Sequence, residues 1–153
     1  MKKNIYSISV CVCLFLSACS HSVAPESIGK VVSIKLETHF LSTGGTSFIT
    51  VTADTIKVVE YSLGTIWNDS TAYYKGILDT ILTTFDLAEV WSIDREDNNP
   101  IQILSITTQS MATDSATSIT HSTKVLRYDG DRPGAIDKLI KKLSVESLKL
   151  RKP

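Results

Sequence analysis

Hydrophobic and polar residues alternate along the first third of the chain after residue 30. A period of two is typical of a half-buried strand, because successive side chains point to opposite faces of a sheet. It predicts a strand over 31–41, a glycine turn at Gly44 and Gly45, and two further strands over 47–53 and 55–61. Together these segments predict a three-stranded antiparallel meander. In the first strand the two alternating sets are Ile34, Leu36, Thr38 and Phe40 against Lys35, Glu37 and His39.

Two later segments carry the spacing of amphipathic helices. Residues 63–69 look irregular, and Ser70 is a candidate cap for the first helix, whose threonine content indicates that packing holds it together. A second helix follows a turn that contains Pro133. The two apolar stripes are Tyr74, Ile77, Leu78, Ile81, Leu82 and Phe85 in the first helix, and Ile136, Leu139, Ile140 and Leu143 in the second.

Between the helices, residues 101–108 and 119–128 read as two more strands, joined by a polar connection over 109–118. The predicted order is therefore β-β-β-α-β-β-α. Two helices with one apolar stripe each need one shared apolar face to cover. This predicts an α+β fold over 30–150, with an antiparallel sheet of about five strands and both helices on one side.

The start of the chain has a different pattern. Lys2 and Lys3 precede an apolar run over 5–18, which is shorter than the roughly 20 residues of a membrane-spanning helix. Its end, Leu16-Ser17-Ala18-Cys19, resembles the lipobox of bacterial lipoproteins. The resemblance implies a signal peptide over 1–18, a diacylglyceryl group on Cys19 and a tether over 19–29. Such an anchor holds stably when it carries at least two chains. Where a cell has two membranes, it also implies the outer one.

Charge and cysteine content narrow the function classes. The chain has 16 basic and 16 acidic residues, and because the leader holds Lys2 and Lys3 and no acid, the mature chain carries a formal charge of −2. That balance disfavours nucleic-acid binding, which uses a basic stripe. Cys11 and Cys13 lie in the leader and Cys19 carries the lipid, so the mature domain has no thiol for a disulfide, a nucleophile or a zinc site.

Candidate metal-ligating and catalytic groups are sparse. His39 and His121 lie in predicted strands, where they either meet across the sheet or remain solvated. Two clusters, Asp94-Arg95-Glu96-Asp97-Asn98 and Asp129-Gly130-Asp131, carry carboxylates, but neither completes a calcium loop, and turns explain both. No nucleophile elbow or phosphate-binding glycine loop occurs. We therefore assign no catalytic residue, no metal and no cofactor.

Candidate contact residues are clearer. Trp67 and Trp91 flank the first predicted helix, and with Tyr73 and Tyr74 they either form a binding patch or close the edge of the core. The turn at Gly44 and Gly45 is a second candidate for contact.

The order of the elements is similar to that of emfourin-like proteins, which are small inhibitors of thermolysin-type metallopeptidases. The matching pieces are the strand and double-glycine turn over 40–45, the helix over 77–85, the strand over 101–108 and the closing helix over 136–143. The resemblance implies an inhibitory role for the turn at Thr43 to Thr46. The lipid anchor and the long connection over 109–118 depart from the family pattern.

These observations favour a non-enzymatic, lipid-anchored protein of the cell envelope that contacts another envelope or secreted protein. Two alternatives remain open. One is a tethered peptidase inhibitor that presents the Gly44 and Gly45 turn, and the other is a hydrolase whose carboxylates are scattered in the sequence.

Overall fold

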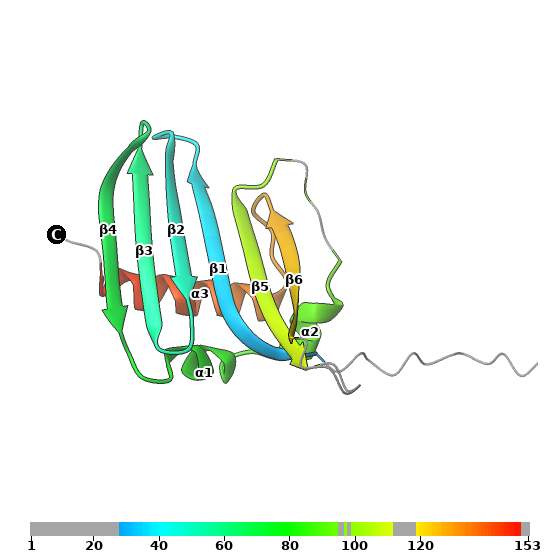
Figure 1. Ribbon diagram of the computed structural model, residues 1–153. Helices are drawn as coiled ribbons and strands as arrows, with labels where there is room; N and C mark the ends of the chain where they lie inside the picture. Colours follow the sequence, from blue (N-terminus) through cyan, green and yellow to red (C-terminus); the bar gives the residue numbers. More distant parts are fainter. Residues whose placement is uncertain (1–27, 95–96, 98, 112–118, 151–153) are drawn as a thin grey trace, which may run out of the picture.

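The computed structural model describes residues 28–94, 97, 99–111 and 119–150 (Figure 1). The lipobox with Cys19 and most of the predicted tether lie outside the described residues, as do Glu96 and Asn98 of one candidate ion loop. No helix in the described part is long and apolar enough to cross a bilayer.

In the described part of the chain, six antiparallel strands form one open sheet in the order β4-β3-β2-β1-β5-β6. The α+β class and the antiparallel sheet are confirmed, but the prediction of about five strands is wrong by one. The strands are β1 (Lys30–Phe40), β2 (Gly45–Val51), β3 (Thr55–Ser62), β4 (Thr65–Tyr73), β5 (Gln102–Met111) and β6 (Ile119–Tyr128).

The strand that the sequence pattern missed is β4, at one edge of the sheet. Its inward positions include Asn68, which is buried, and Ser70 and Ala72, which are half-buried. Because polar side chains occupy positions where strands usually carry Val or Ile, the period of two is invisible as a hydrophobic pattern. Ser70 therefore caps no helix: it lies inside β4, and its hydroxyl donates a hydrogen bond to Asn68 Oδ1 at 2.8 Å.

The described residues contain three helices instead of the predicted two: α1 (Ile77–Leu82), α2 (Leu87–Ser92) and α3 (Gly134–Leu148). The first apolar stripe is split because α1 ends at Thr83 and a new helix begins after Asp86. The Asp86 carboxylate accepts hydrogen bonds from the backbone N–H groups of Ala88 and Glu89, which is the pattern of an N-cap.

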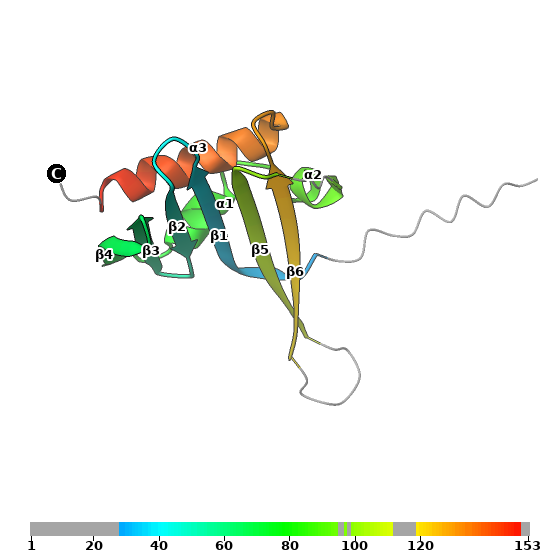
Figure 2. The same cartoon turned by 90° about the horizontal axis from the view of Figure 1, so that it is seen from above.

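The core lies between one face of the sheet and α3, which runs across several strands (Figure 2). Helices α1 and α2 both contact α3, so the helices gather on one side as the single stripes require. Among the described residues, no helix lies on the other face of the sheet (Figure 2). Fully buried members of the core include Ile34, Leu36, Val51, Ile56, Leu104, Ile106, Leu126, Ile136, Leu139 and Leu143.

Candidate functional site

Two hairpin turns lie together at one end of the sheet, which we call the hairpin end (Figure 1). The first joins β1 to β2 over 41–44, and the second joins β3 to β4 through Leu63 and Gly64. They are neighbours because β2 and β3 pair with each other. A Cβ atom placed on Gly44 would lie 3.7 Å from Leu63 Cδ2, so the two turns are in contact.

The two candidate glycines have different structural roles. Gly44 takes a φ of 63°, as expected for a turn that needs a left-handed residue. Gly45 is the buried first residue of β2, and a Cβ atom there would lie 3.0 Å from the carbonyl oxygen of Tyr61. Gly44 therefore shapes the turn, whereas Gly45 allows β2 and β3 to approach closely.

An irregularity in the pairing of β3 with β4 sets the direction of the Trp67 side chain. Glu60 lies opposite Asn68 and Tyr61 lies opposite Ile66, which leaves Trp67 as an extra residue on the edge strand. Such a bulge redirects a side chain and bends the strand. The indole of Trp67 is 57% exposed.

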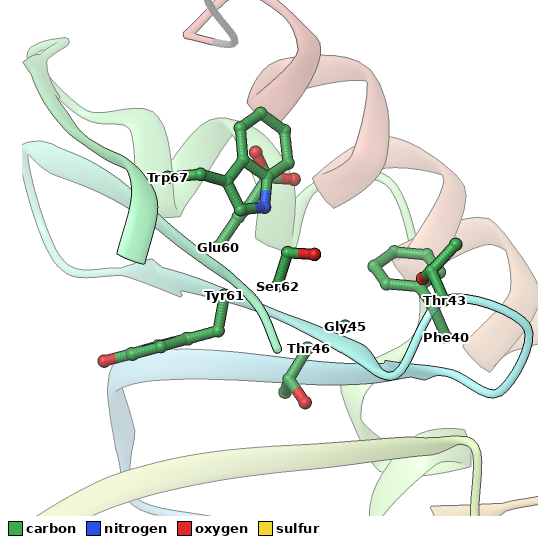
Figure 3. A pocket seen from close by; sticks show the side chains of 8 residues that line it. All are labelled: Phe40, Thr43, Gly45, Thr46, Glu60, Tyr61, Ser62 and Trp67. Carbon is green, nitrogen blue, oxygen red and sulfur yellow. The ribbon is translucent and has the colours of Figure 1, made fainter. Parts of the chain in front are cut away.

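Beside Trp67 is a pocket of about 390 Å³. Figure 3 shows Trp67 and Phe40 on either side of Ser62, while Tyr61 points in another direction. The pocket is large enough for one bulky side chain, and its most prominent walls are aromatic. Its lining residues are Phe40, Thr43, Gly45, Thr46, Glu60, Tyr61, Ser62 and Trp67.

A buried polar network supports this pocket from behind. Glu60 is only 3% exposed, and its carboxylate accepts hydrogen bonds from Asn68 Nδ2 at 3.0 Å and from Ser47 Oγ at 3.4 Å. Asn68 Oδ1 in turn accepts the bond from Ser70. Buried polar groups that are hydrogen-bonded in this way rigidify their surroundings. The network joins β2, β3 and β4 and so holds the bulge that carries Trp67.

The structure does not bring the two tryptophans together. Trp91 lies on α2, half-buried against the core, whereas β4 forms the opposite edge of the sheet (Figure 1). Tyr73 and Tyr74 follow at the far end of β4 and are exposed. Of the four candidate contact residues, Gly44, Gly45 and Trp67 share the hairpin end and Trp91 lies elsewhere.

The two histidines are also far apart. His39 Nε2 lies 3.1 Å from Glu37 Oε1, and its Nδ1 lies 3.3 Å from Thr46 Oγ1. His121 lies opposite Gln109 on β5, whereas the backbone of His39 bonds to Ile101. Eight residues of strand separate these two positions, roughly 26 Å along the sheet. The two histidines therefore cannot share a metal ion or a proton.

The candidate carboxylates do not form a metal site among the described residues either. Asp94, Asp129 and Asp131 are exposed. Within the described ranges, no three His, Cys, Asp or Glu side chains are grouped so that they could hold a metal ion.

Sequence reasoning missed Glu60 and Leu63 as residues of the hairpin end, and it placed Phe40 before the glycine turn without naming it as a contact residue. One signal was available for Leu63, because the Leu63-Gly64 pair directly follows the predicted strand over 55–61, and a glycine there is typical of a two-residue hairpin turn. Glu60 gave no signal, since a single acidic residue in a strand usually faces water.

Comparisons with known proteins found no family model, no curated protein and no solved structure that matches the chain.

Proposed function

We propose that this protein is anchored in the cell envelope by a lipid on Cys19 and acts by binding another protein through the Trp67 pocket. The observation that carries the binding part is the pocket itself, with the exposed indole of Trp67 on one side and Phe40 on the other. The anchor rests on the lipobox resemblance of Leu16 to Cys19.

Three properties of the pocket support a protein partner. Its volume of about 390 Å³ accepts one bulky side chain and lies at the low end of the range of ligand pockets. Tryptophan is enriched among the residues that dominate binding energy at protein interfaces. The hydrogen-bonded network of Glu60, Asn68 and Ser70 fixes the backbone behind Trp67, so little ordering of that wall remains to oppose binding.

Crosslinking in intact cells tests the binding part. A photoreactive amino acid in place of Ser62, which lines the pocket, should yield a specific crosslinked protein, and Trp67→Ala in the same chain should abolish that product. The same probe at Val125, exposed on β6 and away from the pocket, is the control. No product from position 62, or the same product from position 125, would count against the pocket as the binding site.

Fatty-acid labelling tests the anchor. Cys19→Ala should abolish incorporation of a fatty-acid analogue and leave the leader uncut by the lipoprotein route, because no other side chain at that position supplies a thiolate. The matched control is Cys13→Ala within the leader, which should label normally. Label that persists in the Cys19→Ala chain would contradict the anchor.

One observation supports the alternative that the protein is a peptidase inhibitor. The turn over 41–44 is exposed, and it includes part of the Thr43 to Thr46 segment to which the emfourin resemblance points. Titration of a thermolysin-type peptidase with the chain is a direct test. Inhibition that Gly44→Val removes would favour this alternative, and unchanged peptidase activity at a large excess of the chain would eliminate it.

A further inference from the structure

Leu63 is an unusual choice at the β3–β4 turn. Leu63 and Gly64 form a two-residue hairpin loop with φ values of 49° and 80°. Turns with positive φ at both positions favour Asn-Gly, because Asn tolerates the left-handed region far better than Leu does. The Leu63 side chain is also 86% exposed, so it adds almost nothing to the core. Neither the local backbone nor packing calls for leucine here.

Leu41, at the neighbouring turn, is exposed to the same degree, at 85%. The two turns touch through Gly44 and Leu63. Residues 40–46 and 62–67 contain no Asp, Glu, Lys, Arg or His. The two turns and the residues next to them are therefore uncharged, and each turn carries an exposed leucine; Glu37 and His39 lie behind them on β1.

We propose that Leu41 and Leu63 dock this end of the domain onto the lipid bilayer that holds its anchor. Leucine is among the side chains that enter a bilayer most favourably, and Trp67 behind the turns matches the tryptophans found at membrane interfaces. A protein partner fits the two leucines less well than the Trp67 pocket, because leucine is under-represented and tryptophan enriched among the dominant contacts of protein interfaces. The inference goes beyond the protein contact proposed above and relies on that proposal only for the anchor.

The tether is long enough for the lipid on Cys19 and the two leucines to reach the same bilayer. The anchor side of the sheet is the start of β1 at Lys30, and the turn lies ten residues further, about 33 Å along the strand. Eleven residue steps separate Cys19 from Lys30 and span at most about 40 Å. The start of β1 can therefore lie away from the bilayer while Leu41 and Leu63 contact the bilayer.

Protein-free vesicles provide the test. The chain from Cys19 onward contains every described strand and helix, and Cys19 is its only cysteine, so it can be coupled to a maleimide lipid in phosphatidylcholine vesicles. In a Trp91→Phe background, Trp67 is the only tryptophan. Its fluorescence should be quenched when the vesicles contain phosphatidylcholine brominated near the headgroup. Because the tip is uncharged, quenching should not change between low and high salt.

The decisive comparison is the double variant Leu41→Asn, Leu63→Asn. Removing each buried leucine should weaken docking about tenfold, so quenching should be lost. Asn suits the backbone at position 63, so the variant keeps its fold. Ile119→Asn, which removes an exposed apolar residue at the start of β6, is the matched control and should quench like the parent.

Absence of quenching in the coupled parent, or equal quenching in the double variant, overturns bilayer docking. If the double variant quenches normally but loses its crosslinked product in cells, the leucines serve the protein partner instead. Since the vesicles contain no protein, failure here leaves the proposed protein contact untouched.

Discussion

At the scale of single residues, backbone conformation and exposure distinguish the roles of Gly44, Gly45 and Leu63 at the hairpin end. Gly44 is needed for its φ of 63° and Gly45 for the space beside Tyr61. Leu63, by contrast, holds a left-handed conformation at a cost, and its side chain packs against no core residue because it is exposed. The stability of the fold does not account for Leu63.

The left-handed backbone at position 63 predicts that Leu63→Asn stabilises the protein. Leucine in the left-handed region costs about 1 kcal/mol, most of which asparagine recovers. Thermal denaturation should therefore show a melting temperature raised by about 3 °C. Leu41→Asn is the control, because position 41 has no positive φ, and its melting temperature should stay near that of the parent. A Leu63→Asn protein no more stable than the parent would show that the turn is unstrained.

At the scale of elements, the structure departs from the prediction in the first helix, where hydrogen bonds to two aspartates fix where α1 and α2 begin. The N–H of Gly76 donates to Asp54 Oδ1 at 2.7 Å, which ties the start of α1 to the β2–β3 turn. Asp86 then caps α2 and divides the predicted helix. The bond from Gly76 to Asp54 joins residues that are distant in sequence, so a periodicity in one segment cannot report it.

Helix α3 carries the clearest ionic pairs of any element in the described part of the chain. Glu146 lies 2.5 Å from Lys149 Nζ and 3.1 Å from Lys142 Nζ. The hydrogen bond from Lys149 is the largest cause that lowers the pKa of Glu146 below its ordinary value of 4.5, against an opposing effect of burial. A carboxyl group whose pKa is lowered on folding stabilises the fold above its unfolded pKa and loses that contribution as the pH falls through its folded value.

Glu146→Gln should therefore be less stable than the parent at pH 7, by about 0.5–1 kcal/mol. The gap should close as the pH falls from about 5 through the lowered pKa of Glu146. Urea denaturation at a series of pH values measures it. In a Lys149→Met background the same substitution should have a smaller effect, because the main hydrogen bond is already gone. A gap that is constant from pH 7 to pH 3 would show that the ion pairs contribute nothing.

At the scale of the whole molecule, α3 is the cover of the core. Its fully buried residues Ile136, Leu139 and Leu143 lie against side chains from the sheet and from the other helices. The sheet buries one face only, so removing part of this cover weakens the whole domain rather than one element. The hairpin end depends on the same cover, because the last turn of α3 lies near Phe40 and Ser47.

Leu139→Ala should lower the free energy of unfolding by about 2–4 kcal/mol, through lost burial and the cavity left behind. Urea denaturation of the purified chain measures this as a lower midpoint with an unchanged slope. Val145→Ala on the exposed side of the same helix should change stability by less than about 0.5 kcal/mol. Equal losses in the two variants would contradict the assignment of Leu139 to the core.

The sequence alone determined the α+β class, the antiparallel sheet, five of the six strands in the described part of the chain, α3 and the turn at Gly44 and Gly45, because each depends on local periodicity or on backbone freedom. Tertiary structure decided the rest. The inward face of β4 is polar because Asn68 bonds to Glu60 across the sheet, and the start of α1 is held by the bond from the N–H of Gly76 to the carboxylate of Asp54 in the β2–β3 turn. Likewise, only the pairing of β2 with β3 places Gly44, Leu63 and the Trp67 pocket at one end. Contacts between strands join residues that no single segment contains, and local patterns carry no information about them.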